Sequence, residues 1–168
     1  MCKYRGHSCG PSPIDRGKPG SKISVISDGN GIPLGFTIAG ANVSDVTLLE
    51  ETLEKRIKPN REIVQTLFLD RGYRGEPARL VTEKAGFVYK RPLLPDNSPY
   101  ADVVARQWSK ADRIKRSKIE PGNAWLQNFK SVLTRYDRRA VNYRANIHIA
   151  MILIVWRRIC QSRIDNDD

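Results

Sequence analysis

The sequence is poor in the residues that build disulfide frameworks and zinc sites. Its three cysteines, Cys2, Cys9 and Cys160, are odd in number and widely scattered, and only two histidines accompany them. A disulfide framework or a zinc knuckle needs paired, closely spaced ligands, so neither is expected. His7 lies near the first two cysteines, so these three side chains could form a metal cluster, but a disordered terminus is the favoured interpretation there. The chain is therefore predicted to be a reduced, cytosolic protein.

Long hydrophobic runs are absent as well. No stretch approaches the ~20 apolar residues that a membrane span needs. The longest one, Ile147 to Trp156, is interrupted by His148. Residues 1–7 are largely polar and lack the apolar core of a signal peptide. With 168 residues, of which 40% are hydrophobic, one compact domain with no membrane partner is predicted.

Acidic residues are too few to balance the basic ones. The formal net charge is +11, from 29 Lys and Arg against 18 Asp and Glu. Residues 1–100 carry 15 basic and 11 acidic side chains, whereas residues 101–168 carry 14 and 7. A surface that serves only solubility usually mixes the two signs. The excess therefore favours a polyanionic partner, above all nucleic acid.

Turn signals and alternating residues mark the N-terminal part of the chain. Residues 1–21 are rich in Gly, Pro and Ser and are predicted to be irregular. Alternation over 22–27 and again over 33–38, on either side of two glycine turn dipeptides, predicts a β-hairpin. Asp28 is predicted to be a residue of that turn.

Helices and strands alternate in the middle of the chain. The patterns predict a helix from Ser44 or Asp45 to about Lys55, a strand over Thr66 to Leu69, a helix over 76–84 and a strand over 87–90. This order predicts an α/β fold with a mixed sheet and flanking helices. The hairpin and the strand that precedes Asp70 are expected to share that sheet.

The C-terminal third is predicted to be helical. Pro121 fits the first turn of a helix that runs to about Tyr136 and places four apolar residues on one face, namely Trp125, Phe129, Val132 and Leu133. A last helix, over about 141–159, is apolar enough to be largely buried. Residues 161–168 are predicted to be a disordered tail.

Asp70 is the first candidate site residue. It directly follows the apolar strand and precedes two glycines, Gly72 and Gly75. A carboxylate at the carboxyl edge of a central strand is held by the sheet and still faces a ligand, so its oxygens can bind a hard cation. The alternative is that Asp70 only stabilises the following turn, a position that Asp favours. The segment alone does not decide between them.

Several motifs in order resemble one family. They are Gly10-Pro-Ser-Pro-Ile-Asp-Arg-Gly-Lys-Pro-Gly-Ser-Lys22, then Asp28-Gly-Asn-Gly-Ile-Pro-Leu34 with Gly40-Ala-Asn-Val-Ser-Asp45, then Leu69-Asp-Arg-Gly-Tyr-Arg-Gly75, then Trp125-Leu-Gln-Asn-Phe129 and Arg135-Tyr-Asp-Arg-Arg-Ala-Val-Asn-Tyr143. Together they resemble the transposases of small bacterial insertion sequences, which carry a DDE triad on an RNase H-like fold. The resemblance runs from about Gly10 to Arg158.

The resemblance implies a metal-dependent activity on DNA. Family members hydrolyse and transfer DNA phosphodiester bonds with a pair of Mg²⁺ or Mn²⁺ ions, held ~3.5–4 Å apart by carboxylates. Asp70 matches the second aspartate of the triad, and Glu120, four residues after Arg116, matches its glutamate. Both are thus implied to be catalytic metal ligands. Their carboxyl groups are expected to converge.

The chain also departs from the family pattern. The first catalytic aspartate lies upstream of the Gly10 motif in the family, and residues 1–9 contain no acid. We therefore expect an N-terminally truncated protein whose sheet misses its first strand, with a partial catalytic domain over 22–160. Such a chain is expected to be inactive alone, and Asp28 and Asp45 are the first candidates to replace the missing ligand. The alternative is a non-catalytic remnant that binds DNA or a transposase subunit.

DNA is the implied partner, with a full-length transposase or a second copy of the chain as further candidates. The contacts are expected to be mainly with phosphates. The protein is expected to be located in the bacterial cytoplasm, at the nucleoid. The candidate phosphate-binding residues are Arg113, Lys115, Arg116, Lys118, Lys130, Arg135, Arg138 and Arg139.

Overall fold

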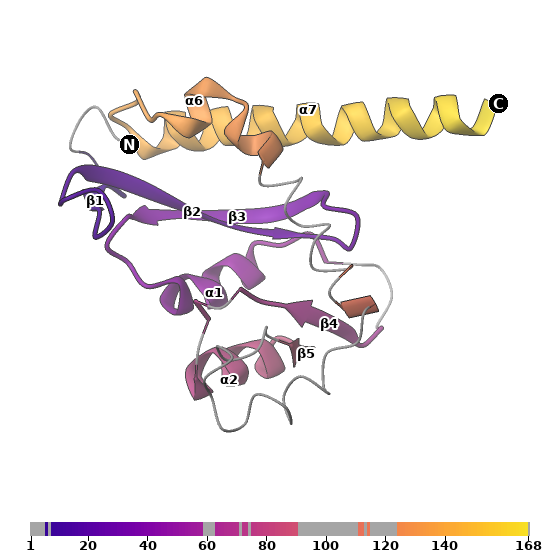
Figure 1. Cartoon of the computed structure of the whole chain (residues 1–168), viewed down its shortest axis with the longest axis horizontal. Helices are drawn as coiled ribbons and strands as arrows, with labels where there is room; N and C mark the ends of the chain where they lie inside the picture. Colours follow the sequence, from indigo (N-terminus) through magenta and orange to yellow (C-terminus); the bar gives the residue numbers. More distant parts are fainter. Residues whose placement is uncertain are drawn as a thin grey trace.

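The structure is a computed structural model that describes residues 6, 8–58, 63–70, 72–73, 75–90, 111–112, 114 and 124–167. It shows a mixed α/β architecture, as the sequence predicts (Figure 1). The long C-terminal helix α7 lies along one side of the first sheet, and helix α1 lies on the other side (Figure 1). In the described part of the chain, no helix is long and apolar enough to cross a membrane.

The first sheet is built on the predicted hairpin. Its strands are β1 (Gly10–Pro11), β2 (Pro19–Ser27) and β3 (Pro33–Gly40), in the order β1-β2-β3 with antiparallel pairing. Asp28 forms the turn as predicted, because its Oδ1 accepts the backbone N–H groups of Asn30 and Ile32, each at 2.8 Å. This bonding fixes the register of the two long strands.

The second sheet contains two parallel strands, β4 (Gln65–Phe68) and β5 (Phe87–Lys90). Helix α2 (Glu76–Lys84) connects them, and helix α1 (Asp45–Glu54) packs between this unit and the first sheet. The predicted boundaries of α2 and β5 are confirmed. Residues of α1, α2 and β2 and the residue that follows β4 share one hydrophobic cluster, formed by Ile26, Leu49, Leu53, Leu69 and Ala78.

The expectation that the hairpin shares one sheet with the strand before Asp70 is wrong for the described residues. Strands β2 and β4 belong to separate sheets, and the units are joined by side-chain packing instead of backbone pairing. Among the described residues, no strand lies between them to pair with both edges.

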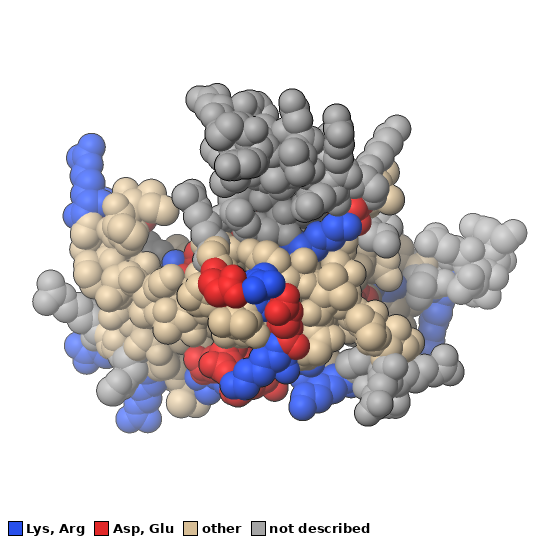
Figure 2. All heavy atoms as spheres, turned by 90° about the horizontal axis from the view of Figure 1, so that it is seen from below, with Lys and Arg blue, Asp and Glu red and all other residues tan. Residues whose placement is uncertain are grey.

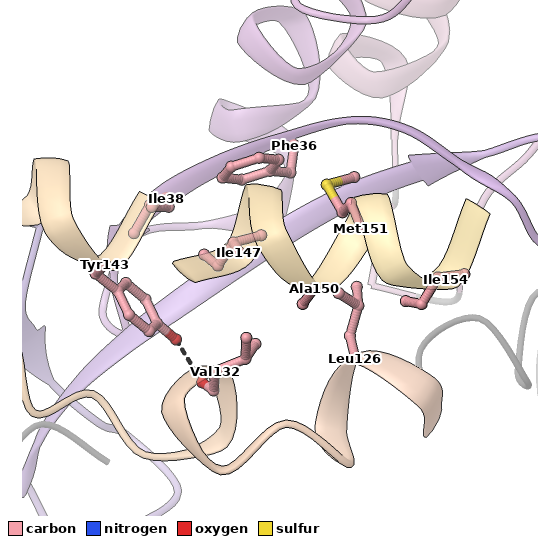
Figure 3. Packing of buried hydrophobic residues seen from close by; sticks show 9 residues of the cluster. All are labelled: Phe36, Ile38, Leu126, Val132, Tyr143, Ile147, Ala150, Met151 and Ile154. Carbon is pink, nitrogen blue, oxygen red and sulfur yellow. Dashed lines mark hydrogen bonds between the residues drawn. The ribbon is translucent and has the colours of Figure 1, made fainter. Parts of the chain in front are cut away.

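A second hydrophobic cluster joins the first sheet to the C-terminal region. Ile147, with no exposed surface, lies at its centre between Phe36 of β3 and the short helix α6 (Lys130–Leu133) (Figure 3). The Tyr143 hydroxyl donates a hydrogen bond to the Val132 carbonyl at 2.6 Å, which ties α6 to α7 (Ala140–Asp167).

The C-terminal helices differ from the prediction in several respects. The predicted helix from Pro121 to Tyr136 is interrupted: a helical turn over 124–127 is separated from α6 by Asn128 and Phe129. Leu133 is exposed, whereas Val132 is buried. The last helix continues to Asp167, so residues 161–167 are helical where a disordered tail was predicted.

Helix α7 also buries less of its surface than the sequence suggests. Ile152 and Trp156 are 65% and 63% exposed, and Ile149 is exposed as well. A helix that packs on one face of a narrow sheet buries only one stripe of side chains. The prediction of a largely buried helix is therefore wrong for the opposite stripe.

Candidate metal centre

Asp70 lies two residues beyond β4, at the carboxyl end of the second sheet. The preceding Leu69 is 6% exposed, and its N–H donates to the Lys90 carbonyl at 2.9 Å. The Asp70 carbonyl accepts the N–H of Tyr73 at 3.1 Å, and its side chain is exposed. The sheet thus anchors the backbone on one side of Asp70 and a turn anchors it on the other, while the side chain lies at the surface.

Asp45 is a second carboxylate near this edge. It occupies the first turn of α1, where the helix dipole favours a negative side chain. Its Oδ1 lies 3.0 Å from Lys22 Nζ, and this ammonium also donates to the Val43 carbonyl at 3.0 Å. A side chain at Gly72 would come within 3.3 Å of Asp45 Oδ2. The loop that follows Asp70 therefore passes directly beside Asp45.

The pKa of the Tyr73 hydroxyl is affected by both carboxylates, Asp45 and Asp70. Burial raises the pKa of its hydroxyl above the ordinary value, a hydrogen bond with Ser24 acts in the opposite direction, and the negative charges of Asp45 and Asp70 raise this pKa further. The Tyr89 hydroxyl donates to the Tyr73 carbonyl at 2.9 Å and holds the loop against β5. Asp45, Asp70 and Tyr73 all line the same groove.

The two candidates for a substitute ligand are placed differently. The Asp28 carboxylate bonds to the backbone of its own turn, which directly follows β2. Asp45 is the one that the structure brings toward Asp70. Within the described ranges, no group of three or more His, Cys, Asp or Glu side chains is placed to hold a metal ion. Glu120, the predicted partner of Asp70, lies outside the described residues.

A groove of about 980 Å³ runs between β2 and β4. Asp45, Asp70 and Tyr73 line it together with Ser24 of β2. Arg56 and Lys58, which follow the carboxyl end of α1, also line it. The acidic residues are therefore part of a long cleft and not of a closed pocket.

The predicted DNA contacts separate into three groups. Lys130, Arg138 and Arg139 are exposed, so their assignment as phosphate contacts stays a prediction. Arg135 is 2% exposed, so its assignment as a phosphate contact is corrected to a structural role. Four other candidates lie outside the described residues: Arg113, Lys115, Arg116 and Lys118.

Arg135 joins three segments that are distant in the sequence. Its guanidinium donates to the carbonyls of Asp137, Arg138 and Ser8 and to the Ser21 hydroxyl, at 2.8–3.2 Å. It also lies 5.3 Å from the centre of the Tyr143 ring. Nothing in the local basic sequence distinguishes Arg135 from its exposed neighbours.

Sequence reasoning also missed some residues of this region. It did not single out Tyr73, although the residue follows the strand-end aspartate by three positions. It also omitted the exposed basic residues of α7, Arg144, Arg157 and Arg163. Arg144 and Arg157 were concealed within a predicted helix that was expected to be buried, and Arg163 lay in a predicted disordered tail.

The face formed by α1 and α2 differs from the basic C-terminal region. Acidic and basic side chains lie next to one another on the surface that Figure 2 shows. Arg79 pairs with Glu76 and Glu83, and Lys84 pairs with Glu50 at 3.0 Å. Since its basic groups are neutralised locally, this surface is not expected to attract DNA.

Comparisons with known proteins agree with the sequence motifs. The family model described as "Transposase DDE domain" matches residues 3–155. A Burkholderia cepacia protein named as a transposase for insertion sequence element IS402 is 30% identical over 159 residues, which cover 89% of this chain and 69% of the relative. No solved structure matches the chain.

Proposed function

This chain belongs to the family of insertion-sequence transposases with a DDE domain, and from that membership we propose that it provides part of the catalytic centre that cuts and joins DNA. The proposed substrate is the DNA at the ends of an insertion sequence. Asp70 and Glu120 are the proposed metal ligands. The observation that carries the proposal is the position of Asp70 just beyond the carboxyl end of β4, in a groove that a second carboxylate, Asp45, also lines.

The donor chemistry at this edge fits a hard divalent cation. Asp70 and Asp45 offer carboxylate oxygens, which are the ligands that Mg²⁺ and Mn²⁺ prefer. When bound, such a cation supplies charge stabilisation for the attacking and leaving oxygens of a phosphodiester. The order of strands and helices supports assignment of an RNase H-like fold, in which, among the described residues, no strand lies between β2 and β4.

The chain's own residues would hold and orient the substrate. The backbone at Asp70 is held by hydrogen bonds on both sides, which limits the directions that its carboxylate can take. Lys130, Arg138 and Arg139 are exposed cations that would bind phosphates and position the DNA backbone. Tyr73 would keep its hydroxyl protonated beside the two carboxylates, because burial and both charges favour that state.

The chain alone is proposed to have little or no activity. Asp45 is already paired with Lys22 at 3.0 Å, which competes with a metal ion for the same oxygen atoms. Because this ion pair opposes metal binding, it also supports the second candidate function, which is a non-catalytic module that binds DNA or an intact transposase. Both candidates use the same basic residues, and they differ in whether a metal binds at Asp70.

Metal binding can be tested with Mn²⁺ as a paramagnetic probe. Titration is expected to broaden the amide NMR signals of Gly72 and Tyr73 first, and to lower the Tyr73 pKa because the cation offsets the two negative charges. Asp70→Asn is expected to weaken binding by at least about tenfold, since it removes a charged ligand. Asp28→Asn, whose carboxylate serves a turn, is the matched control and should bind Mn²⁺ as the parent does. Equal Mn²⁺ affinity of Asp70→Asn and the parent would refute the metal site.

A further inference from the structure

Helix α7 exposes an apolar stripe on the side that faces away from the first sheet. Five large apolar side chains of this stripe are exposed, namely Ile149, Ile152, Leu153, Trp156 and Ile159. The α7 residues that pack toward β3 and α6, such as Ile147 and Ile154, belong to the buried side of the helix. The carboxyl end of α7 extends beyond the strands of the first sheet (Figure 1). Single exposed apolar residues are common, but a contiguous set of them marks an interaction surface.

The spacing within the stripe is that of a seam between two helices. Its main residues follow one another at intervals of three, four and three positions, namely Ile149, Ile152, Trp156 and Ile159. Ala145 and Arg163 continue the stripe by four positions at either end. Alternating intervals of three and four place side chains along one line of a helix, where a second helix inserts its own side chains between them. The stripe therefore fits a helical partner.

The two ends of α7 carry opposite charges. Arg144 is exposed near the amino end, and the first turn of the helix has no acidic residue. At the carboxyl end, the sequence of residues 165–168 includes three aspartates. Each of these charges has the same sign as the helix dipole at its end, so the dipole does not compensate it. A second α7 that runs in the opposite direction offsets both ends, because each basic end then lies beside an acidic end.

The side chains of the stripe favour the same direction. In a parallel pair, identical residues meet, so two Trp156 rings would share one layer and two Arg163 guanidinium groups would repel each other. In an antiparallel pair, Trp156 of one copy meets the smaller Ile152 of the other. Arg163 then meets Ala145. Large side chains opposite smaller ones fill a seam without voids or strain.

We propose that α7 pairs in antiparallel direction with α7 of a second copy of this chain, which gives a dimer with twofold symmetry. Ile149 of each copy packs against Ile159 of the other, and Ile152 packs against Trp156. The twofold axis then passes at the level of position 154, midway between the members of each pair. The inference goes beyond the proposed catalytic function, and it does not depend on a metal at Asp70.

Analytical ultracentrifugation of the full chain, freed of nucleic acid, tests the dimer. A species of twice the monomer mass of 19.1 kDa is expected. Its Kd is expected to be on the order of micromolar, because a contact between two helices is small beside the ~800 Å² that each partner buries in a typical stable interface.

Two substitutions in the stripe are expected to weaken the dimer. Trp156→Ala removes the largest side chain of the seam, and Ile152→Glu places a charge within it. Each is expected to raise the Kd at least about tenfold. Leu80→Glu is the matched control, because Leu80 is also an exposed apolar residue of a helix but belongs to α2. This variant should dimerise as the parent does. Circular dichroism verifies that each variant is folded.

The exposed Cys160 provides a test of direction. A nitroxide label is attached to it after Cys2→Ser and Cys9→Ser, and the distance between the labels of the two copies is measured by electron paramagnetic resonance. Cys160 lies six positions beyond the twofold axis, so the two labels are separated by about 18 Å along the helices at ~1.5 Å per residue. In a parallel pair, only the interaxial distance of ~8–10 Å would separate their backbones.

Three results would overturn the proposal. They are a parent chain that stays monomeric at millimolar concentration, equal dimerisation of Ile152→Glu and Leu80→Glu, and a label separation that fits the parallel pair. Asp70→Asn should dimerise as the parent does. Loss of Mn²⁺ binding in that variant with an intact dimer keeps the two proposals separate, and a parent that fails to bind Mn²⁺ but dimerises would refute the metal site alone.

Discussion

The Arg135→Ala variant is expected to lose about 3 kcal/mol of unfolding free energy, because hydrogen bonds from a charged group contribute ~1.5–3 kcal/mol each and only part of that is recovered by water. The guanidinium donates to three carbonyls and a hydroxyl and is 2% exposed. Its removal leaves the carbonyls of Ser8 and Arg138 without this donor. Urea unfolding, followed by circular dichroism, measures the loss.

Arg139→Ala is the matched control for this prediction. Arg139 is also basic and lies four residues away, but it is exposed. Its replacement is expected to change stability by less than about 0.5 kcal/mol. If both variants unfolded at the same urea concentration as the parent, the structural role of Arg135 would be wrong.

DNA affinity is expected to fall by roughly 10⁴-fold between 50 and 200 mM salt, since each neutralised phosphate adds about −0.9 to the slope of log K against log salt. Seven candidate basic residues remain after Arg135 is excluded, and each is taken to neutralise one phosphate. Lys130, Arg138 and Arg139 are the described members of this set. Fluorescence anisotropy with a labelled duplex, titrated at several salt concentrations, measures the slope.

Single substitutions distinguish this basic set from the general charge of the protein. Arg139→Ala is expected to weaken binding for all sequences and to reduce the slope by about one. Arg79→Ala removes the same charge from α2, where Glu76 and Glu83 already neutralise it, and should leave the slope unchanged. Equal effects of both substitutions would show that only net charge matters. Binding without salt dependence would contradict the phosphate-based model.

The N-terminal half of the fold could be predicted from the sequence because its signals are local. The glycine dipeptides after Asp28 specify a tight turn, and alternation on both sides specifies strands. Gly86 ends α2 with a positive φ of 83°, which only glycine adopts at little cost, and the apolar run after it gives β5. The turn, the end of α2 and strand β5 are each specified by neighbouring residues and do not depend on distant contacts.

The C-terminal half depends on contacts that the sequence does not display. Apolar content alone predicted a buried α7, but the narrow sheet covers only one stripe of the helix, so Ile152 and Trp156 remain exposed. The break at Asn128 and Phe129 lets α6 place Val132 against Ile147. The burial of Arg135 is set by partners up to 127 residues away. Such tertiary effects override local periodicity.

The candidate site was predictable in part. The transition from strand to Asp70 is a local pattern, and the structure places this residue at a sheet edge as expected. The association of Asp45 with Tyr73 depends on how α1 packs against the loop after β4, which no spacing rule specifies. Convergence of Glu120 with Asp70 stays a prediction, since Glu120 lies outside the described residues.

A DNA cleavage assay with Mg²⁺ or Mn²⁺, comparing this chain with Asp70→Ala, tests the central claim most directly. The claim is that the chain holds part of a transposase metal centre around Asp70 and is inactive alone. The account predicts that both proteins bind the duplex and that neither cleaves it above background, because two-ion chemistry needs a complete set of ligands. Robust cleavage by the parent chain that Asp70→Ala abolishes would contradict this prediction and identify Asp45 as the first residue to test as a further ligand.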